Sequence, residues 1–129
     1  MASVYEAAGG EETFTRLIDR FYAGVDQDPV LRRLYPQDEE LYLASQEHLR
    51  LFLIQYWGGP GWYQERRGHP RLRMRHMPFP IGRRERDAWM GHMAGAIESL
   101  DLDPAVRAAF LDYFERAATA MMNQGGPPF

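Results

Sequence analysis

A single histidine lies inside a short, arginine-rich stretch of the chain that two prolines bracket. The seven residues between Pro70 and Pro78 read RLRMRHM, and the histidine is His76. An imidazole nitrogen can bind iron, and guanidinium groups pair with carboxylates. These residue types would suit a flat, anionic ligand that carries iron.

Other interpretations of the same stretch are open from the residues alone. A lone histidine is more often a surface residue or a hydrogen-bonded core residue than a metal ligand. The alternation from Arg71 to Arg75 is typical of a half-buried edge strand, whereas a helical turn would put Leu72 and His76 on one face. The arginines would also suit a patch that binds nucleic acid.

The composition points to one globular domain without cysteine chemistry. The chain has 129 residues, of which 45% are hydrophobic and 26% are charged, as expected for a single folded domain. The absence of cysteine excludes disulfides, thiolate metal ligands and a cysteine nucleophile. No run of about 18 apolar residues is present, so no membrane span is expected. Because the first residues also lack the pattern of a signal peptide, we expect a cytoplasmic location.

The charge of the chain is unevenly distributed. All 15 basic residues are arginine, and residues 66–86 hold eight of them with one acidic residue, Glu85. This segment has a net charge of +7, whereas the remainder of the chain has −10. A basic segment in an acidic protein favours a local anionic ligand over general nucleic-acid binding.

Hydrophobic periodicity predicts an all-α chain without strands. A short turn over residues 4–8 is expected to end at Gly9–Gly10, and a brief helical turn starts at Asp28–Pro29 and closes before Tyr35–Pro36. Between them lies a long helix whose apolar face Tyr22 extends. The inward positions of this helix are Phe14, Leu17, Ile18, Phe21 and Val25.

Three further long helices are expected, with an irregular connection among them. They run from about Leu41 to Trp57 after an acidic loop at 37–40, from about Arg84 to Leu100, and from Asp103–Pro104 to about Met122. Residues 58–75 are predicted to be a long loop, which in a compact domain is usually functional, and residues 124–129 a loose tail. In the helix from about Leu41 to Trp57, one face is formed by Ser45, Leu49, Phe52, Leu53 and Tyr56.

No familiar catalytic motif accompanies the histidine. The histidines at positions 48, 69, 76 and 92 are scattered and lack the spacing of a closed zinc site. No glycine-rich phosphate loop follows a strand, and no catalytic residue is predicted. An aromatic-rich helical protein with one histidine in an arginine-rich segment permits a haem pocket without proving one.

Five segments of the chain form a specific pattern in their order and spacing. They read RFY (20–22), VLRRLYP (30–36), QYWGGP (55–60), GHPRLRMRH (68–76) and RDAW (86–89). Taken together, they resemble the group II truncated haemoglobins of the actinobacterial type, and the resemblance covers about residues 4–122.

The resemblance implies a single truncated globin domain over residues 1–129, with residues 125–129 as a loose tail. Its fold would be a two-over-two helical sandwich around haem b, which is protoporphyrin IX with iron. His76 matches the proximal iron ligand of the family, and its second N–H is expected to donate to a carbonyl or a carboxylate. The alternating stretch then becomes a loop that enters a very short helix.

The resemblance also implies which residues surround the haem. Tyr22, Tyr35 and Trp89 match the distal polar residues, whose hydrogen bonds predict slow oxygen release. Either Ser45 or Ala44 would stand at the distal gate, with Leu49 facing the ligand and Phe52 lining the cavity. On the other side, His48 stands where relatives often carry arginine. The residues expected to contact the haem or its propionates are Tyr63, Arg67, Leu72, Arg73 and Arg75, with Arg71 as a further candidate.

The expected function is reversible binding of dioxygen, and also of carbon monoxide and nitric oxide. The alternative is a haem enzyme that performs nitric oxide dioxygenation or peroxidase-like chemistry, which would need a separate reductase. A nucleic-acid or scaffold module ranks last. Relatives differ in oligomeric state, so the sequence leaves a homo-oligomer open.

Overall fold

The computed structural model describes residues 3–124, and this part of the chain is entirely helical, with no strand. The predicted all-α class is therefore confirmed, and the edge-strand interpretation of residues 71–75 is wrong. The predicted tail at 125–129 lies outside the described residues. The helices are α1 (Val4–Ala8), α2 (Glu11–Asp26), α3 (Pro29–Arg32), α4 (Glu39–Tyr56), α5 (Trp62–Arg67), α6 (Leu72–His76), α7 (Arg83–Glu98) and α8 (Pro104–Ala120).

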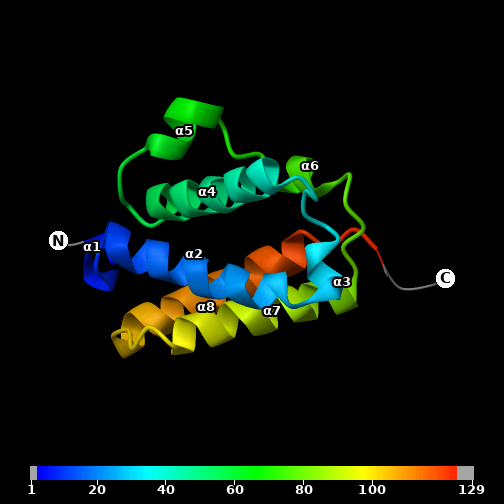
Figure 1. Cartoon of the computed structure of the whole chain (residues 1–129). Helices are drawn as coiled ribbons and strands as arrows, with labels where there is room; N and C mark the ends of the chain where they lie inside the picture. Colours follow the sequence, from blue (N-terminus) through cyan, green and yellow to red (C-terminus); the bar gives the residue numbers. More distant parts are fainter. Residues whose placement is uncertain (1–2, 125–129) are drawn as a thin grey trace.

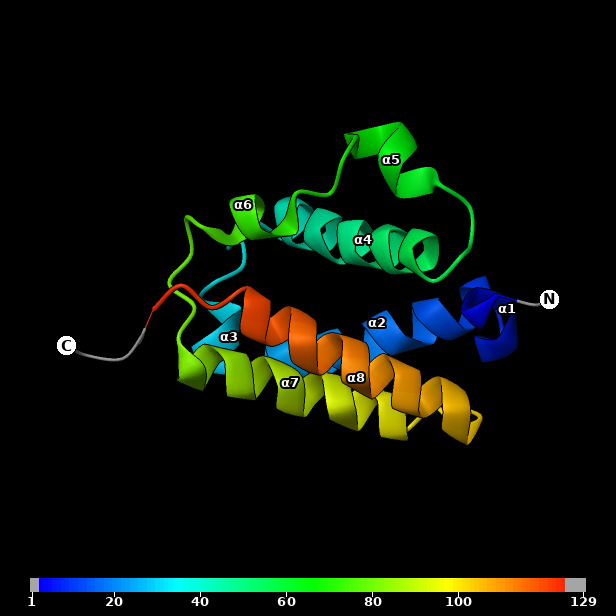
Figure 2. The same ribbon diagram turned by 180° about the vertical axis from the view of Figure 1, so that it is seen from behind.

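Four long helices form two packed pairs. α2 packs against α4, α7 packs against α8, and α2 also packs on α7 (Figure 1). The short helices α3 and α6 lie at the same end of the molecule as the start of α4 and the start of α7, and Figure 2 shows the same arrangement from behind. None of the helices in the described part combines the length and apolar character that a membrane span needs.

Acidic residues determine where several helices begin. The Asp38 carboxylate accepts from the N–H of Leu41 at 3.0 Å, so α4 begins at Glu39 and the predicted acidic loop is wrong in its second half. Asp28 and Asp103 cap α3 and α8 in the same way, and both helices then start with proline as predicted. Glu85 accepts from the N–H of Gly82, and α7 begins at Arg83.

The core confirms the predicted inward face of α2. Phe14, Leu17, Phe21 and Val25 are fully buried, and the ring of Phe14 lies 5.7 Å from that of Phe110 on α8. The helix therefore carries its apolar stripe against its neighbours, as its spacing required. Tyr56 differs from the prediction, because 49% of its surface is exposed.

The predicted irregular connection contains two helices. α5 packs on α4, and the backbone then turns through Gly68 (φ 73°) and Arg71 (φ 44°) before α6. Positive φ is costly for a residue with a Cβ, so Arg71 marks a tightly constrained entry into α6. These two helices have six and five residues, which is too few to show a periodic hydrophobic pattern in the sequence.

The helices α2 and α7 approach closely at Gly24, where a Cβ would clash with the ring of His92. The Nε2–H of His92 donates to the carboxylate of Asp28 at 2.8 Å. This bond ties the start of α3 to the middle of α7, and α3 carries the chain into the end of the molecule where the candidate site lies.

We expect Asp28→Asn to lower the free energy of unfolding by about 1 kcal/mol near neutral pH, since a charge-assisted hydrogen bond weakens while the helix cap remains. The hydrogen bond from His92 holds the pKa of Asp28 below its usual range. The carboxylate therefore stabilises the fold above its unfolded pKa of about 3.9, and this stabilisation is lost as the pH falls through the lower folded pKa. Melting temperatures of both proteins from neutral pH down to strong acid test this.

The matched control is Asp112→Asn, which changes an exposed pair with Arg116 and should alter stability little. A difference between wild type and Asp28→Asn that persists unchanged in acid would contradict the prediction.

Candidate functional site

His76 is the last residue of α6, and its ring is held by its own helix. Its Nδ1 lies 2.6 Å from the carbonyl oxygen of Leu72, one turn earlier. Because a carbonyl can only accept, Nδ1 carries the proton, and the lone pair of Nε2 is left for a metal. Leu72 is half-buried against the core, so residues 72 and 76 share a face as the helical interpretation predicted.

Three tyrosine rings pack edge to face at the end of the molecule where α3 lies. The ring centroids are 5.5 Å apart for Tyr22 and Tyr35, 5.8 Å for Tyr22 and Tyr42, and 5.9 Å for Tyr35 and Tyr42. The ring of Trp89 on α7 lies 5.1 Å from that of Phe21, which in turn lies 4.9 Å from that of Tyr22. The structure thus brings the three predicted distal residues together.

Burial raises the pKa of each of these phenols further above physiological pH. It raises the pKa of Tyr22 well above the usual value, and repulsion and hydrogen bonding by Tyr35 raise it further. Burial also raises the pKa of Tyr35, although hydrogen bonds with Tyr22 and Trp89 oppose this. For Tyr42, burial and the bond that its hydroxyl donates to Asp26 at 2.6 Å both raise the pKa. All three hydroxyls are neutral at physiological pH.

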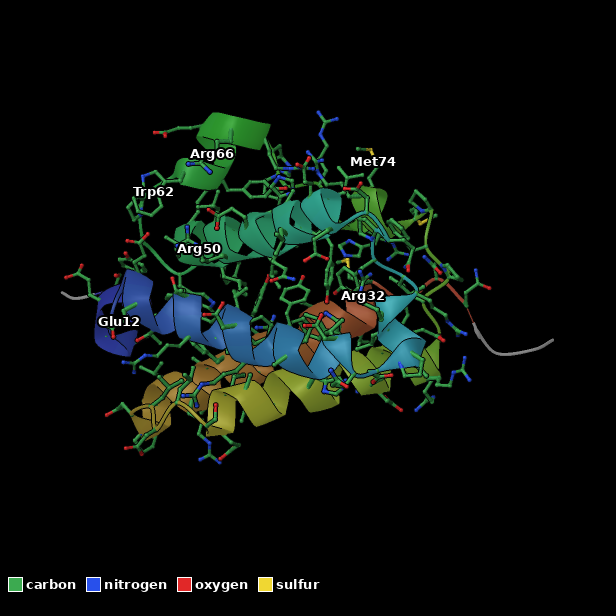
Figure 3. All side chains as sticks on the ribbon, viewed as in Figure 1. Glu12, Arg32, Arg50, Trp62, Arg66 and Met74 are labelled. Carbon is green, nitrogen blue, oxygen red and sulfur yellow. The ribbon has the colours of Figure 1, made fainter. Side chains whose placement is uncertain are left out.

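Tyr42 belongs to this cluster although it was not among the residues predicted from the sequence. The guanidinium of Arg32, labelled in Figure 3, lies 3.7 Å from the centroid of its ring and donates to the carbonyl of Pro36 at 2.8 Å. The signal was present in the sequence, since Tyr42 lies three residues before Ser45 on the same helical stripe.

The predicted gate residues lie on the first half of α4. The hydroxyl of Ser45 donates to the carbonyl of Leu41 at 3.1 Å, so it is bound within its own helix. Ala44 and Ser45 are both half-buried. Further along the helix, Leu49 is half-buried against the core and Phe52 is buried. Leu49 and Phe52 thus give this part of α4 an apolar face.

Tyr63 and Arg67 of α5 lie against α4. The buried ring of Tyr63 lies 5.7 Å from that of Phe52. One terminal nitrogen of Arg67 lies 3.0 and 3.1 Å from the two ring nitrogens of His48, and the Nε of Arg67 is buried without a partner among residues 3–124. Burial and the charges of Arg67 and Arg75 lower the pKa of His48. Arg67 therefore keeps a donor that an anion could take up.

The other predicted arginines differ in what they do. Arg75 donates from Nε to the carbonyl of Pro70 at 2.8 Å and from a terminal nitrogen to that of Arg67 at 3.4 Å, so it braces the connection between α5 and α6. Arg71 and Arg73 are exposed. Arg71 and Arg73 are thus accessible to an anion, whereas the guanidinium of Arg75 is hydrogen-bonded to backbone carbonyls.

A cavity of about 520 Å³ opens between α3 and the segment that follows α6. Tyr35, from the segment after α3, and Phe79, from the segment after α6, both line this cavity. Arg33 and Glu85 also line it and form an ion pair of 3.5 Å. The remaining lining residues are Leu34, Pro36, Pro80 and Gln124.

The described residues include the kinds of group that an iron porphyrin requires. His76 offers an Nε2 lone pair, the apolar side chains of Leu49, Phe52 and Leu72 could contact a flat ring, and Arg67 offers an unused donor for a carboxylate. An all-helical fold that carries such a histidine together with these apolar and basic side chains is the arrangement of a globin, a class of haem proteins.

The chain belongs to the bacterial-like globin family, whose model matches residues 3–123. It is 40% identical over 120 residues to group 2 truncated hemoglobin YjbI of Bacillus subtilis, covering 93% of this chain and 88% of that protein. Among solved structures, a thermostable hemoglobin of the actinobacterium Thermobifida fusca is 57% identical with a TM-score of 0.89, over 95% of this chain and 98% of that one. A truncated oxygen-avid haemoglobin from Bacillus subtilis is 38% identical with a TM-score of 0.87, over 95% and 100%.

These comparisons confirm the predicted group II truncated haemoglobin and its two-over-two fold. The family implies a haem cofactor and the binding of small gaseous ligands such as oxygen.

Proposed function

We propose that the protein binds haem b through the Nε2 atom of His76 and uses it to bind dioxygen reversibly. The observation that carries this proposal is the 2.6 Å hydrogen bond from Nδ1 of His76 to Leu72, because it selects the tautomer that can ligate iron. When bound, haem supplies a ferrous iron that takes up a diatomic gas. Carbon monoxide and nitric oxide are further ligands of the same site.

Tyr22, Tyr35 and Trp89 hold the ligand by donating hydrogen bonds to it. The raised pKa values of the two phenols keep their protons in place. A hydrogen bond to a charged acceptor is worth roughly 1.5–3 kcal/mol, so each good donor slows release by about tenfold or more. The similar truncated haemoglobin from Bacillus subtilis is oxygen-avid, which supports slow release here also.

The basic residues on α5 and α6 hold the haem propionates. Arg67 is the first choice, because its Nε is buried without a partner in the described chain. Tyr63 packs beside it, and exposed Arg73 and Arg71 are further donors, while Arg75 acts mainly through the loop that it braces. On the distal side, Leu49 and Phe52 line the ligand space, and Ser45 or Ala44 forms its gate.

The experiment that tests this function is an absorption spectrum of the purified protein after addition of hemin. We expect a Soret band that moves on reduction with dithionite and again on addition of carbon monoxide. A chain that shows no Soret band with excess hemin would contradict the proposal, and the arginine-rich segment would then need another anionic ligand.

The enzymatic alternative is nitric oxide dioxygenation or peroxidase-like chemistry. Slow release by three donors favours it, because a retained ligand has time to react. Re-reduction would come from a separate reductase. Catalytic consumption of nitric oxide by the oxygenated protein, supplied with an external reductant, would distinguish it from simple binding.

A further inference from the structure

Asn123 lies beyond the end of α8 and bonds to the segment that carries His76. Its Nδ2 donates to the carbonyl of Phe79 at 2.7 Å and to that of His76 at 3.3 Å. Its Oδ1 accepts from the N–H of Ile81 at 2.9 Å, and its own N–H donates to the carbonyl of Ile81 at 2.8 Å. One side chain thus ties three points of the segment 76–81 to the last long helix.

The segment needs such support because α6 cannot hold itself. It has five residues, none of them buried, and no side chain caps its start. An isolated helix of this length is far below the length that is stable in water. Arg75 braces the connection before α6 through Pro70 and Arg67, whereas Asn123 holds the connection after it.

Asparagine is suited to this position by its donor and acceptor set. Its NH₂ group satisfies two carbonyls and its oxygen satisfies one N–H, which uses both donors of the amide. Aspartate would keep the acceptor for Ile81 but would face the carbonyls of His76 and Phe79 with a negative charge. The two residues have nearly the same shape, so their exchange isolates the hydrogen bonds from the packing.

We propose that Asn123 is a positioning residue that fixes His76 against the haem iron by holding the backbone at residues 76, 79 and 81. The proposal rests on the proposed function of His76 as the iron ligand. The ring of His76 is oriented by Leu72, and its backbone is anchored by Asn123, so the two bonds together set how the imidazole meets the metal. Hydrogen-bond partners of the ligating side chain itself change metal affinity by about 10–100-fold, which sets the upper bound for a partner that holds the backbone.

The test compares Asn123→Asp and Asn123→Ala with wild type after reconstitution with hemin. The first readout is the iron–histidine stretching frequency of the reduced, ligand-free protein by resonance Raman spectroscopy, which reports on the bond itself. The second is the rate at which hemin transfers to excess apomyoglobin. The matched control is Gln37→Ala, because Gln37 also donates its amide to two backbone carbonyls, those of Arg32 and Tyr35, but on the other side of the site.

We expect both Asn123 variants to shift the iron–histidine frequency and to lose hemin about tenfold faster, while Gln37→Ala leaves the frequency unchanged. Wild-type frequency and wild-type hemin loss in both Asn123 variants would overturn the inference, and so would an equal frequency shift in Gln37→Ala. A wild-type protein without a Soret band would instead show that the proposed function fails. If Asn123→Ala does not fold, the nearly isosteric Asn123→Asp decides between these outcomes.

Discussion

Replacement of His76 by glycine is expected to abolish haem retention, and added imidazole is expected to restore it. The substitution removes the ring whose Nδ1 bonds to Leu72 and leaves space where free imidazole can bind. Residues that hydrogen-bond a metal ligand already change the affinity of the site for its metal by about 10–100-fold. Loss of the ligand itself should therefore accelerate hemin loss by more than about 100-fold. The Soret band of the reconstituted protein with and without imidazole measures this.

The control is His69→Gly, directly before the proline-bracketed stretch. His69 is exposed, and its ring accepts only from the N–H of Arg71 at 3.1 Å among the described contacts. This variant should keep its haem and should not respond to imidazole. A normal Soret band in His76→Gly without imidazole would exclude His76 as the ligand.

Replacement of Trp89 by phenylalanine is expected to speed oxygen release by about tenfold. The indole N–H is one of the three proposed donors to the ligand, and losing a bond of roughly 1.5–3 kcal/mol gives a factor of ten or more. Phenylalanine retains an aromatic ring against Phe21 and Phe114, whose centroids lie 5.1 and 5.8 Å from that of Trp89. Stopped-flow displacement of oxygen by carbon monoxide measures the release rate.

Trp57→Phe is the matched control for this experiment. Its indole N–H is buried without a hydrogen-bond partner in residues 3–124, and its ring packs against Phe110 at 5.0 Å. The same chemical change should therefore leave oxygen release as it is in wild type. If Trp89→Phe also releases oxygen at the wild-type rate, Trp89 only packs, and Tyr22 and Tyr35 hold the ligand without it.

Local residue patterns were sufficient to predict the long helices and their inner faces. Phe14, Leu17 and Phe21 recur at helical spacing and are buried, because a helix can bury only one stripe. Proline after an acidic cap marked the starts of α3 and α8, since both signals act within one turn. The sequence also pointed to His76 as a candidate iron ligand, and the family resemblance behind that prediction is confirmed by the comparisons.

The short elements were the hardest to predict from residue patterns. Residue patterns predicted the segment 58–75 as a loop, and only the family resemblance predicted a very short helix at its end. The segment contains α5 and most of α6. Helices of five or six residues have too few positions to show a period, and they form because the rest of the fold holds them. The start of α4 was misplaced for a related reason, because Asp38 acts as a cap and the two glutamates after it belong to the first turn.

By itself, the sequence determined the helical class and the core stripes and singled out His76 as a candidate iron ligand, because these depend on residue type and local spacing. Only the tertiary structure decided which polar groups surround that histidine. Asn123 lies 47 residues from His76 in the chain, Tyr42 joins Tyr22 across two helices, and Arg75 turns toward backbone carbonyls. Such pairings depend on how the helices pack, and no local pattern records where a distant side chain will find its hydrogen-bond partner.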